Sequence, residues 1–205
     1  MARNEFTFPS ADGKTQIHAV EWLPDGEVRA VLQIAHGVSE YILRYEPFAN
    51  YLTARGFAVV GHDHLGHGSS ATPNGKPMYF GPKGSWNWVV QDIETRRRLA
   101  KERFPNIPYF MLGHSMGSFL LRTYLIRFPG TVDGAIIMGT GHQPGWLLSI
   151  MMGIVKGQIK KAGFDKTTDL VRQLSFGTYN QKFKPNRTAA DWLCSNEREL
   201  DNYLA

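Results

Sequence analysis

The chain has 205 residues, a net charge of +5 and 42% hydrophobic residues, and aromatic side chains make up 12% of it. This length suits a single domain with room for an insertion, and the apolar content excludes a disordered chain. The charge is modest and no nucleic-acid-binding module accompanies it, so we expect no nucleic-acid partner.

The N-terminal part of the chain holds short strand patterns separated by tight turns, at residues 6–8, 16–22 and 28–35. Asp12-Gly13 and Asp25-Gly26 separate these patterns, and Asp-Gly is a strong hairpin signal because both positions tolerate a positive φ. Residues 31–35 are almost continuously apolar, which is typical of a strand buried on both faces. We therefore expect two hairpins leading into a buried sheet.

From residue 45 onward, helical and strand patterns alternate. Helices are predicted at residues 45–55, 85–104 and 118–128, and they stop at Gly56, Pro105 and Pro129. Strands are predicted at residues 57–60, in the apolar run opened by Ile107, and at residues 134–138. This alternation predicts an α/β fold with a mostly parallel sheet and helices on both faces.

A basic run occupies the end of the second predicted helix, at Arg96, Arg97, Arg98 and Lys101. Cations are favourable near a helix C-terminus. We expect these side chains to form a solvated face.

The character of the chain changes after residue 140. Residues 146–155 are apolar around most of a helix, lysines follow, and a polar stretch without strand patterns runs to the end. The sequence predicts a core at residues 1–140 and a helical lid over the mouth of the sheet at residues 141–205. The alternative for the apolar helix is packing against the core or against a second copy.

Ser115 lies where an apolar run breaks into Gly113-His114-Ser115-Met116-Gly117 and then into a helical pattern. The spacing Gly-x-Ser-x-Gly between a strand and a helix is typical of a serine nucleophile on a strained turn. Side chains at Gly113 and Gly117 would collide with the neighbouring strand and helix. Ser115 is therefore the candidate nucleophile.

A second segment is expected at the same place. His36-Gly37-Val38 follows the buried strand at residues 31–35, at the edge where open α/β sheets gather their ligands. Acyl transfer needs two backbone N–H groups aimed at the developing oxyanion, one after the nucleophile and one in this loop. We expect the amides of Val38 and Met116 to form this oxyanion hole.

The loop at residues 63–70 holds Asp63, His64 and His67 among glycines. Two histidines in a glycine loop could indicate a metal site, but this interpretation is not favoured, because no further ligands stand at metal-like spacing. We expect Asp63 to accept backbone hydrogen bonds that hold the loop, and we expect no metal.

These motifs together resemble those of monoacylglycerol lipase-like α/β-hydrolases, a group also labelled lysophospholipase or serine aminopeptidase-like. The resemblance rests on motifs in the family's order: His36-Gly37-x-x-Glu40, Arg44-Tyr45, Asp63-His64-x-Gly66-His67-Gly68-x-Ser70 and Gly113-His114-Ser115-Met116-Gly117. It is strong over residues 5–140 and weaker beyond them.

The resemblance implies an α/β-hydrolase that cleaves an ester of a lipid with one acyl chain, without a cofactor. Ser115 would form an acyl-enzyme that water then resolves. The lid would supply an apolar trough for the acyl chain, with Trp146, Leu147 and Met151 as candidate substrate contacts, and would allow transient contact with a membrane surface.

The chain departs from the family in one respect. The family's acid and histidine follow the lid, after two further strands, whereas the last histidine here is His142, at the start of the lid. We assign neither acid nor base, and we expect residues 134–138 to form an unpaired sheet edge. The sequence thus describes a fragment, or an enzyme completed by self-association or by a complementing C-terminal segment.

Two other functions remain open from the sequence. One is a catalytically silent lipid-binding fragment, and the other is a peptidase or other acyl-transfer enzyme on the same scaffold. Cys194 is the single cysteine, the N-terminal residues show no secretory signal, and no apolar run is long enough to span a membrane, so we expect a cytoplasmic protein.

Overall fold

The structure is a computed structural model, and it describes residues 2–70, 77–163, 166, 170, 173 and 176–204. The chain divides into two compact units, Met1–His142 and Gln143–Ala205. Each unit is described by itself. The role of the second unit as a lid stays a prediction.

A mixed sheet forms the centre of the first unit, and its strand order is β1-β2-β4-β3-β5-β6. Strands β3 to β6 run parallel to one another, whereas β1 and β2 pair antiparallel at one edge. The predicted, mostly parallel sheet is therefore confirmed. The strands are β1 (Ala2–Pro9), β2 (Gln16–Leu23), β3 (Ala30–Ala35), β4 (Phe57–His62), β5 (Tyr109–His114) and β6 (Gly134–Met138).

One of the two predicted hairpins forms. Strands β1 and β2 pair across the turn that contains Asp12-Gly13, where Gly13 adopts a φ of +73°. The hairpin predicted at Asp25-Gly26 is wrong, because β4 lies between β2 and β3 in the sheet and Gly26 has no positive φ. Every residue of β3 is buried, so this strand takes a central position between two parallel neighbours.

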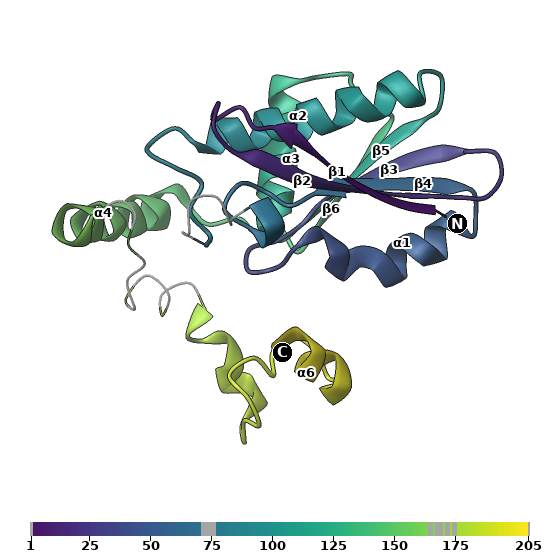
Figure 1. The fold of residues 1–205 in the computed structure, drawn as a ribbon. Coiled ribbons are helices and arrows are strands. Elements are labelled where there is room, and N and C mark those ends of the chain that lie inside the picture. Colours follow the sequence, from purple (N-terminus) through teal and green to yellow (C-terminus); the bar gives the residue numbers. More distant parts are fainter. Residues whose placement is uncertain are drawn as a thin grey trace. The chain divides into compact units, whose positions relative to one another are not determined.

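Helices cover both faces of the sheet, with α2 and α3 on one face and α1 on the other (Figure 1). The helix predicted at residues 45–55 forms as α1, and a short 3₁₀ turn, η1, precedes it. The described residues of this unit form η1 (Ile42–Tyr45), α1 (Glu46–Thr53), η2 (Gly68–Ser70), α2 (Trp86–Arg103) and α3 (Met116–Arg127).

Alternate residues of β3 supply the two cores. Val31 and Ala35 pack in the cluster that includes side chains of α2 and α3, whereas Leu32 and Ile34 pack in the cluster that includes Ala49 of α1. Successive side chains of a strand point to opposite faces, so a continuously apolar strand serves two cores at once. This packing fixes the carboxyl end of β3 between β4 and β5.

The basic run of α2 is not a solvated face. Arg96 is 1% exposed, lies 3.5 Å from Glu21, and has its guanidinium over the ring of Phe6. Arg97 is paired with Glu94 at 2.8 Å, and only Arg98 of the three arginines is exposed. The prediction fails at Arg96 because its long side chain extends from α2 to the sheet, where it pairs with Glu21 of β2.

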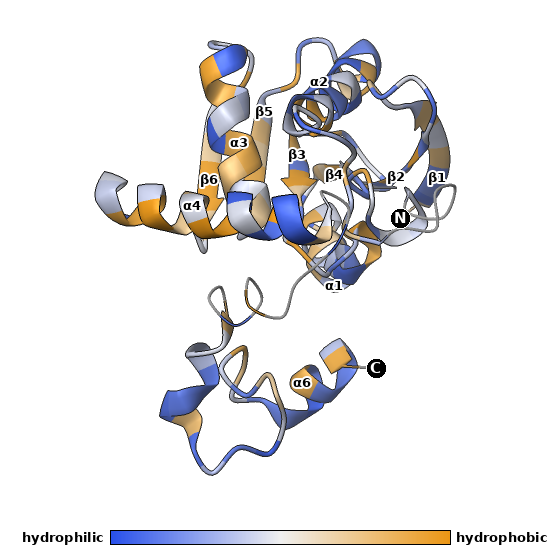
Figure 2. Ribbon diagram, turned by 90° about the vertical axis from the view of Figure 1, so that its left-hand side faces the viewer, coloured by the Kyte–Doolittle hydropathy of each residue, from blue (hydrophilic) through white to orange (hydrophobic). Residues whose placement is uncertain are grey.

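The second unit contains α4 (Gly145–Ala162), η4 (Tyr179–Phe183) and α6 (Glu197–Leu204). Helix α4 confirms the predicted apolar helix and extends it, and Figure 2 shows hydrophobic residues along most of its length. None of its residues is buried. Among the described residues, no helix combines the length and the apolar character needed to cross a membrane.

Candidate active site

Ser115 occupies the turn between β5 and α3, as the motif predicts. Its φ of +51° and ψ of −116° lie in a region that non-glycine residues rarely adopt. The Ser115 amide donates to the carbonyl of Met138 at 2.9 Å, and the amide of Ser118 donates to the carbonyl of Ser115 at 2.9 Å. The Ser115 side chain is half-buried, and its hydroxyl has no hydrogen-bond partner among the described residues.

The two glycines of the motif allow close backbone contacts. A Cβ atom on Gly117 would lie 2.6 Å from the carbonyl oxygen of His36 and closer still to that of Ala35. A Cβ atom on Gly113 would lie 2.5 Å from the Gly117 oxygen and 2.9 Å from the Leu121 side chain. The collisions predicted from the sequence are thus confirmed, and they explain how α3 approaches the end of β3 so closely.

The loop after β3 lies directly against Ser115. A Cβ atom built on Gly37 would be 3.2 Å from the Ser115 Cβ. Val38 follows in a turn, half-buried, and Met116 is the first residue of α3. Neither amide, of Val38 or of Met116, has a hydrogen-bond partner among the described residues. Both predicted donors are therefore free to meet a ligand atom, and their role as an oxyanion hole stays a prediction.

His36 ties this loop to the next one along the sheet edge. Its Nε2 accepts a hydrogen bond from the His64 amide at 3.0 Å, so its proton is on Nδ1, which donates to the Gly37 carbonyl at 2.8 Å. Burial lowers the pKa of His36 to about 4. His36 is thus a neutral scaffold residue.

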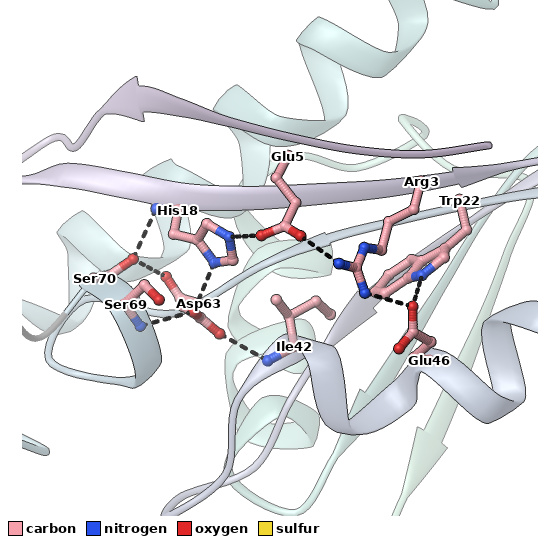
Figure 3. A network of polar contacts seen from close by, with 9 residues as sticks. All are labelled: Arg3, Glu5, His18, Trp22, Ile42, Glu46, Asp63, Ser69 and Ser70. Atoms are coloured by element: carbon pink, nitrogen blue, oxygen red, sulfur yellow. Dashed lines mark hydrogen bonds and ion pairs between the residues drawn. The ribbon is translucent and has the colours of Figure 1, made fainter.

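Asp63 holds its loop as the sequence predicts. Its carboxylate accepts hydrogen bonds from the amides of Ile42 at 2.7 Å and Ser69 at 2.9 Å, and it contacts His18 at 2.8 Å (Figure 3). His18 also contacts Glu5 at 2.8 Å. Burial works against protonation of His18, but the hydrogen bonds to the two carboxylates outweigh it and raise the pKa of His18.

Four histidines form a buried ring cluster beneath the site, consisting of His36, His62, His64 and His67. Ring centroids are 4.2 Å apart for His36 and His64 and 5.0 Å apart for His62 and His64. No group of three or more candidate metal ligands is found among the described residues. The cluster packs as aromatic rings against Phe8 and Phe80.

Glu40 is the centre of a hydrogen-bond network that was not predicted from the sequence. One oxygen of its carboxylate accepts hydrogen bonds from the Gly37 amide, from the Tyr45 hydroxyl at 3.0 Å and from Nδ1 of His114 at 3.0 Å. Glu40 and Tyr45 entered the sequence analysis only as motif letters of the resemblance. The spacing Gly37-x-x-Glu40 was the available signal, because an acceptor three residues after an amide can close a tight turn.

The other sequence candidates belong to α4 or to the segment before it. Trp146, Leu147 and Met151 belong to α4 in the second unit, where Trp146 is 67% exposed and the other two are half-buried. Their role as substrate contacts stays a prediction. His142 is exposed, and no hydrogen bond joins it to Ser115 among the described residues.

Two described acidic residues of the second unit have partners within that unit. Asp191 accepts from the amides of Arg187 and Thr188, and Asp201 pairs with Arg187 at 2.8 Å. Asp165 and Asp169 lie outside the described residues. No acid or base can be assigned on these contacts.

Known structures identify the fold. A carboxyl esterase from Bacillus coagulans superposes with a TM-score of 0.88 at 28% identity, covering 100% of this chain and 65% of the esterase. A lipase in its open form superposes with a TM-score of 0.87 at 25% identity, covering 98% of this chain and 65% of the lipase. The chain is an α/β-hydrolase.

Sequence comparisons define the family. The family described as serine aminopeptidase, S33, matches residues 26–205, and the chain belongs to it. The monoacylglycerol lipase of Mycolicibacterium smegmatis is 33% identical over 137 residues, which are 67% of this chain and 46% of that lipase. Human monoglyceride lipase is 30% identical over 129 residues, which are 63% of this chain and 40% of that lipase. The chain thus spans less than half the length of these curated relatives.

Proposed function

We propose that the chain carries the nucleophile and the oxyanion hole of a serine carboxylic ester hydrolase. The observation that carries the proposal is the geometry at Ser115. Its hydroxyl is unengaged on a strained turn, and the loop that bears Val38 lies against it. A hydroxyl held in this way, beside unpaired amides, suits attack on an acyl carbonyl.

The proposed reaction has two steps. Ser115 Oγ adds to the acyl carbonyl, and the amides of Val38 and Met116 stabilise the resulting oxyanion. When the carbon–oxygen bond to the alcohol breaks, the alcohol leaves with the proton that the Ser115 hydroxyl has lost, and the acyl group stays on Ser115. Water then adds to this ester, the acid is released, and the hydroxyl of Ser115 is regenerated.

The base of this reaction is not assigned. No histidine contacts the Ser115 hydroxyl among the described residues, and removal of a triad base lowers turnover by about 10⁶ in well-studied serine enzymes. Residual catalysis of about 10³–10⁴ over water comes from the oxyanion hole and binding. We therefore expect slow chemistry from this chain, with a Ser115-dependent part above the background that the oxyanion hole and binding give without the serine.

We propose monoacylglycerols or lysophospholipid-type lipids as the substrate class. Support comes from the two lipases matched in sequence and from the exposed apolar side chains of α4, including Trp146 and Ile150. Such a helix offers hydrocarbon contacts to an acyl chain, or to a membrane surface that holds the substrate. Leu147 and Met151 lie four residues apart and therefore share one face of α4.

A panel of substrates tests this proposal. The chain is incubated with monoacylglycerols, lysophospholipids, short-chain esters and aminoacyl amides, and release of the acid is measured. We expect hydrolysis of the lipid esters above that of the amides, and its loss in Ser115→Ala. Ser195→Ala, which removes an exposed serine of the second unit, should match the wild type. Preference for amides would instead favour a peptidase, the second candidate, which the family description supports.

Three further predictions of the sequence analysis stay proposals. Binding of fatty acids without any hydrolysis would identify the silent lipid-binding alternative.

Self-association through β6, whose Ile136 is 50% exposed, is measured by size-exclusion chromatography at increasing concentration, and a monomer throughout would contradict it. Cytoplasmic location, expected from the single Cys194 together with the N-terminal residues and the lack of a long apolar run in the sequence, is tested by cell fractionation.

A further inference from the structure

Glu40 joins the two loops that carry the proposed oxyanion donors. Its Oε1 accepts hydrogen bonds from the Gly37 amide, from the Tyr45 hydroxyl at 3.0 Å and from His114 Nδ1 at 3.0 Å. The donors come from three places: the loop after β3, the turn η1, and the last residue of β5. The side chain of Glu40 is only 8% exposed.

The position of these donors along the chain is the decisive feature. Gly37 immediately precedes Val38, and His114 immediately precedes Ser115, after which comes Met116. Glu40 Oε1 is therefore bonded to the residue just before Val38 and to the residue two positions before Met116. Because it is bonded to both segments, its position affects the distance between them.

A local role for Glu40 is not sufficient to explain these contacts. A residue that only closes the tight turn at residues 37–40 would need the Gly37 amide alone. The contact to His114 bridges 74 residues of sequence, and Tyr45 itself approaches His114 Nδ1 at 3.3 Å. Three side chains and the Gly37 amide thus form one network that joins two loops. Such networks fix geometry more firmly than isolated pairs.

Glu40 remains ionised in this setting. Burial favours its neutral form, but the hydrogen bond from His114 and that from the Gly37 amide outweigh burial and lower the pKa of Glu40. Arg44 lies 3.6 Å from the second oxygen, Oε2. Hydrogen bonds to a charged acceptor are about twice as strong as neutral ones, so the charge adds rigidity to the network.

We propose that Glu40 is a positioning residue that sets the spacing of the two oxyanion-hole amides, Val38 and Met116. The inference rests on the proposed function. Glu40 contacts no reacting atom and acts through Gly37 and His114. Its loss should therefore reduce stabilisation of the transition state and leave binding of the ground-state substrate unchanged.

Hydrolysis of a short-chain p-nitrophenyl ester by the 205-residue chain tests the inference. We expect kcat to fall about 100-fold in Glu40→Ala and about 10-fold in the isosteric Glu40→Gln, with KM within about twofold of the wild type. Asp12→Asn is the matched control, because Asp12 also accepts two backbone amides, those of Lys14 and Thr15, but away from Ser115. It should leave both constants unchanged.

Amide NMR spectra of the same variants provide a readout independent of turnover. In Glu40→Gln we expect shifts at Gly37 and Val38 and also at His114 and Met116, with the melting temperature close to that of the wild type. Shifts confined to residues 37–40, or a loss of kcat/KM through KM alone, would overturn the inference. Wild-type kinetics in both Glu40 variants would overturn it as well.

The same measurements distinguish a failure of the proposed serine chemistry from a failure of the inference about Glu40. If the wild type hydrolyses the ester no faster than Ser115→Ala, the proposed serine chemistry is contradicted, and the inference about Glu40 falls with it. If Ser115→Ala abolishes hydrolysis while the Glu40 variants keep their rate, only the inference about Glu40 is contradicted.

Discussion

At the scale of single residues, the turn at Ser115 depends on the absence of side chains at Gly113 and Gly117. The strained conformation of Ser115 persists only if surrounding contacts determine it, and here α3 contacts the backbone of β3 through Gly117. The missing side chains at Gly113 and Gly117 are therefore structural requirements of the site. This part of the site was predictable from the sequence, because the motif implies its own steric reason.

Gly117→Ala tests this steric requirement. The new methyl group would meet the carbonyl oxygens of Ala35 and His36, which belong to backbone and cannot move aside. We expect a loss of about 1–3 kcal/mol in the free energy of unfolding and at least about a 100-fold slower reaction at Ser115, since the nucleophile shifts. Urea denaturation and ester hydrolysis measure the two effects.

Gly26→Ala is the control for this substitution. Gly26 has no atom within 4 Å of a built Cβ and has no positive φ, so the methyl group meets open space. Its stability and rate should equal those of the wild type. A Gly117→Ala protein that behaves like Gly26→Ala would show that the close contact between α3 and β3 is unimportant.

At the scale of elements, the loop after β3, the last residue of β4 and the loop after β4 carry a buried group of uncharged histidines. Burial lowers the pKa of His36 to about 4 and lowers the pKa values of His62, His64 and His67. Both ring nitrogens of His62 and of His64 lack a hydrogen-bond partner in the described structure, so protonation of either ring inside the fold has no compensation. The unfolded chain, by contrast, protonates histidines near pH 6.5.

Stability should therefore depend on pH through this group. The folded pKa values are lowered, so the unfolded chain binds more protons below pH 6.5, and the free energy of unfolding falls as the pH falls from 6.5 toward 4. Each histidine contributes up to about 1.4 kcal/mol per pH unit. Asp92 opposes this trend, because burial raises its pKa to about 7 and its protonated form loses its advantage as the pH rises from 4 to 7.

His62→Leu isolates one member of the group. We expect the pH slope of the unfolding free energy between pH 5 and 6 to decrease by up to about 1.4 kcal/mol per unit, as measured by urea denaturation. His142→Ala removes an exposed histidine and should leave the slope unchanged. Equal slopes in the wild type and in His62→Leu would show that His62 is protonated alike in the folded and unfolded chains.

At the scale of the whole molecule, the parallel strands and their helices were predictable because periodicity records burial directly. The insertion of β4 between β2 and β3 was not predictable from the sequence. The Asp25-Gly26 signal describes a local turn and does not indicate which strand pairs with β2. Arg96 was misread for a similar reason, because its partner Glu21 lies far away in sequence.

In the candidate site, too, the features set by local sequence were predictable and those set by long-range contacts were not. The nucleophile and the donor loop follow from local motifs, and the structure brings their residues together. The Glu40 network depends on a contact across 74 residues, and no local pattern indicates that His114 and Glu40 meet. The edge strand β6 confirms its predicted exposure, with Ile136, Ile137 and Met138 between 42% and 50% exposed.

The nucleophilic role of Ser115 is tested most directly by a fluorophosphonate probe, followed by peptide mapping of the labelled protein. We expect slow labelling of Ser115 and of no other serine, abolished in Ser115→Ala and unchanged in Ser195→Ala. Labelling at another serine, or undiminished labelling of Ser115→Ala, would contradict it.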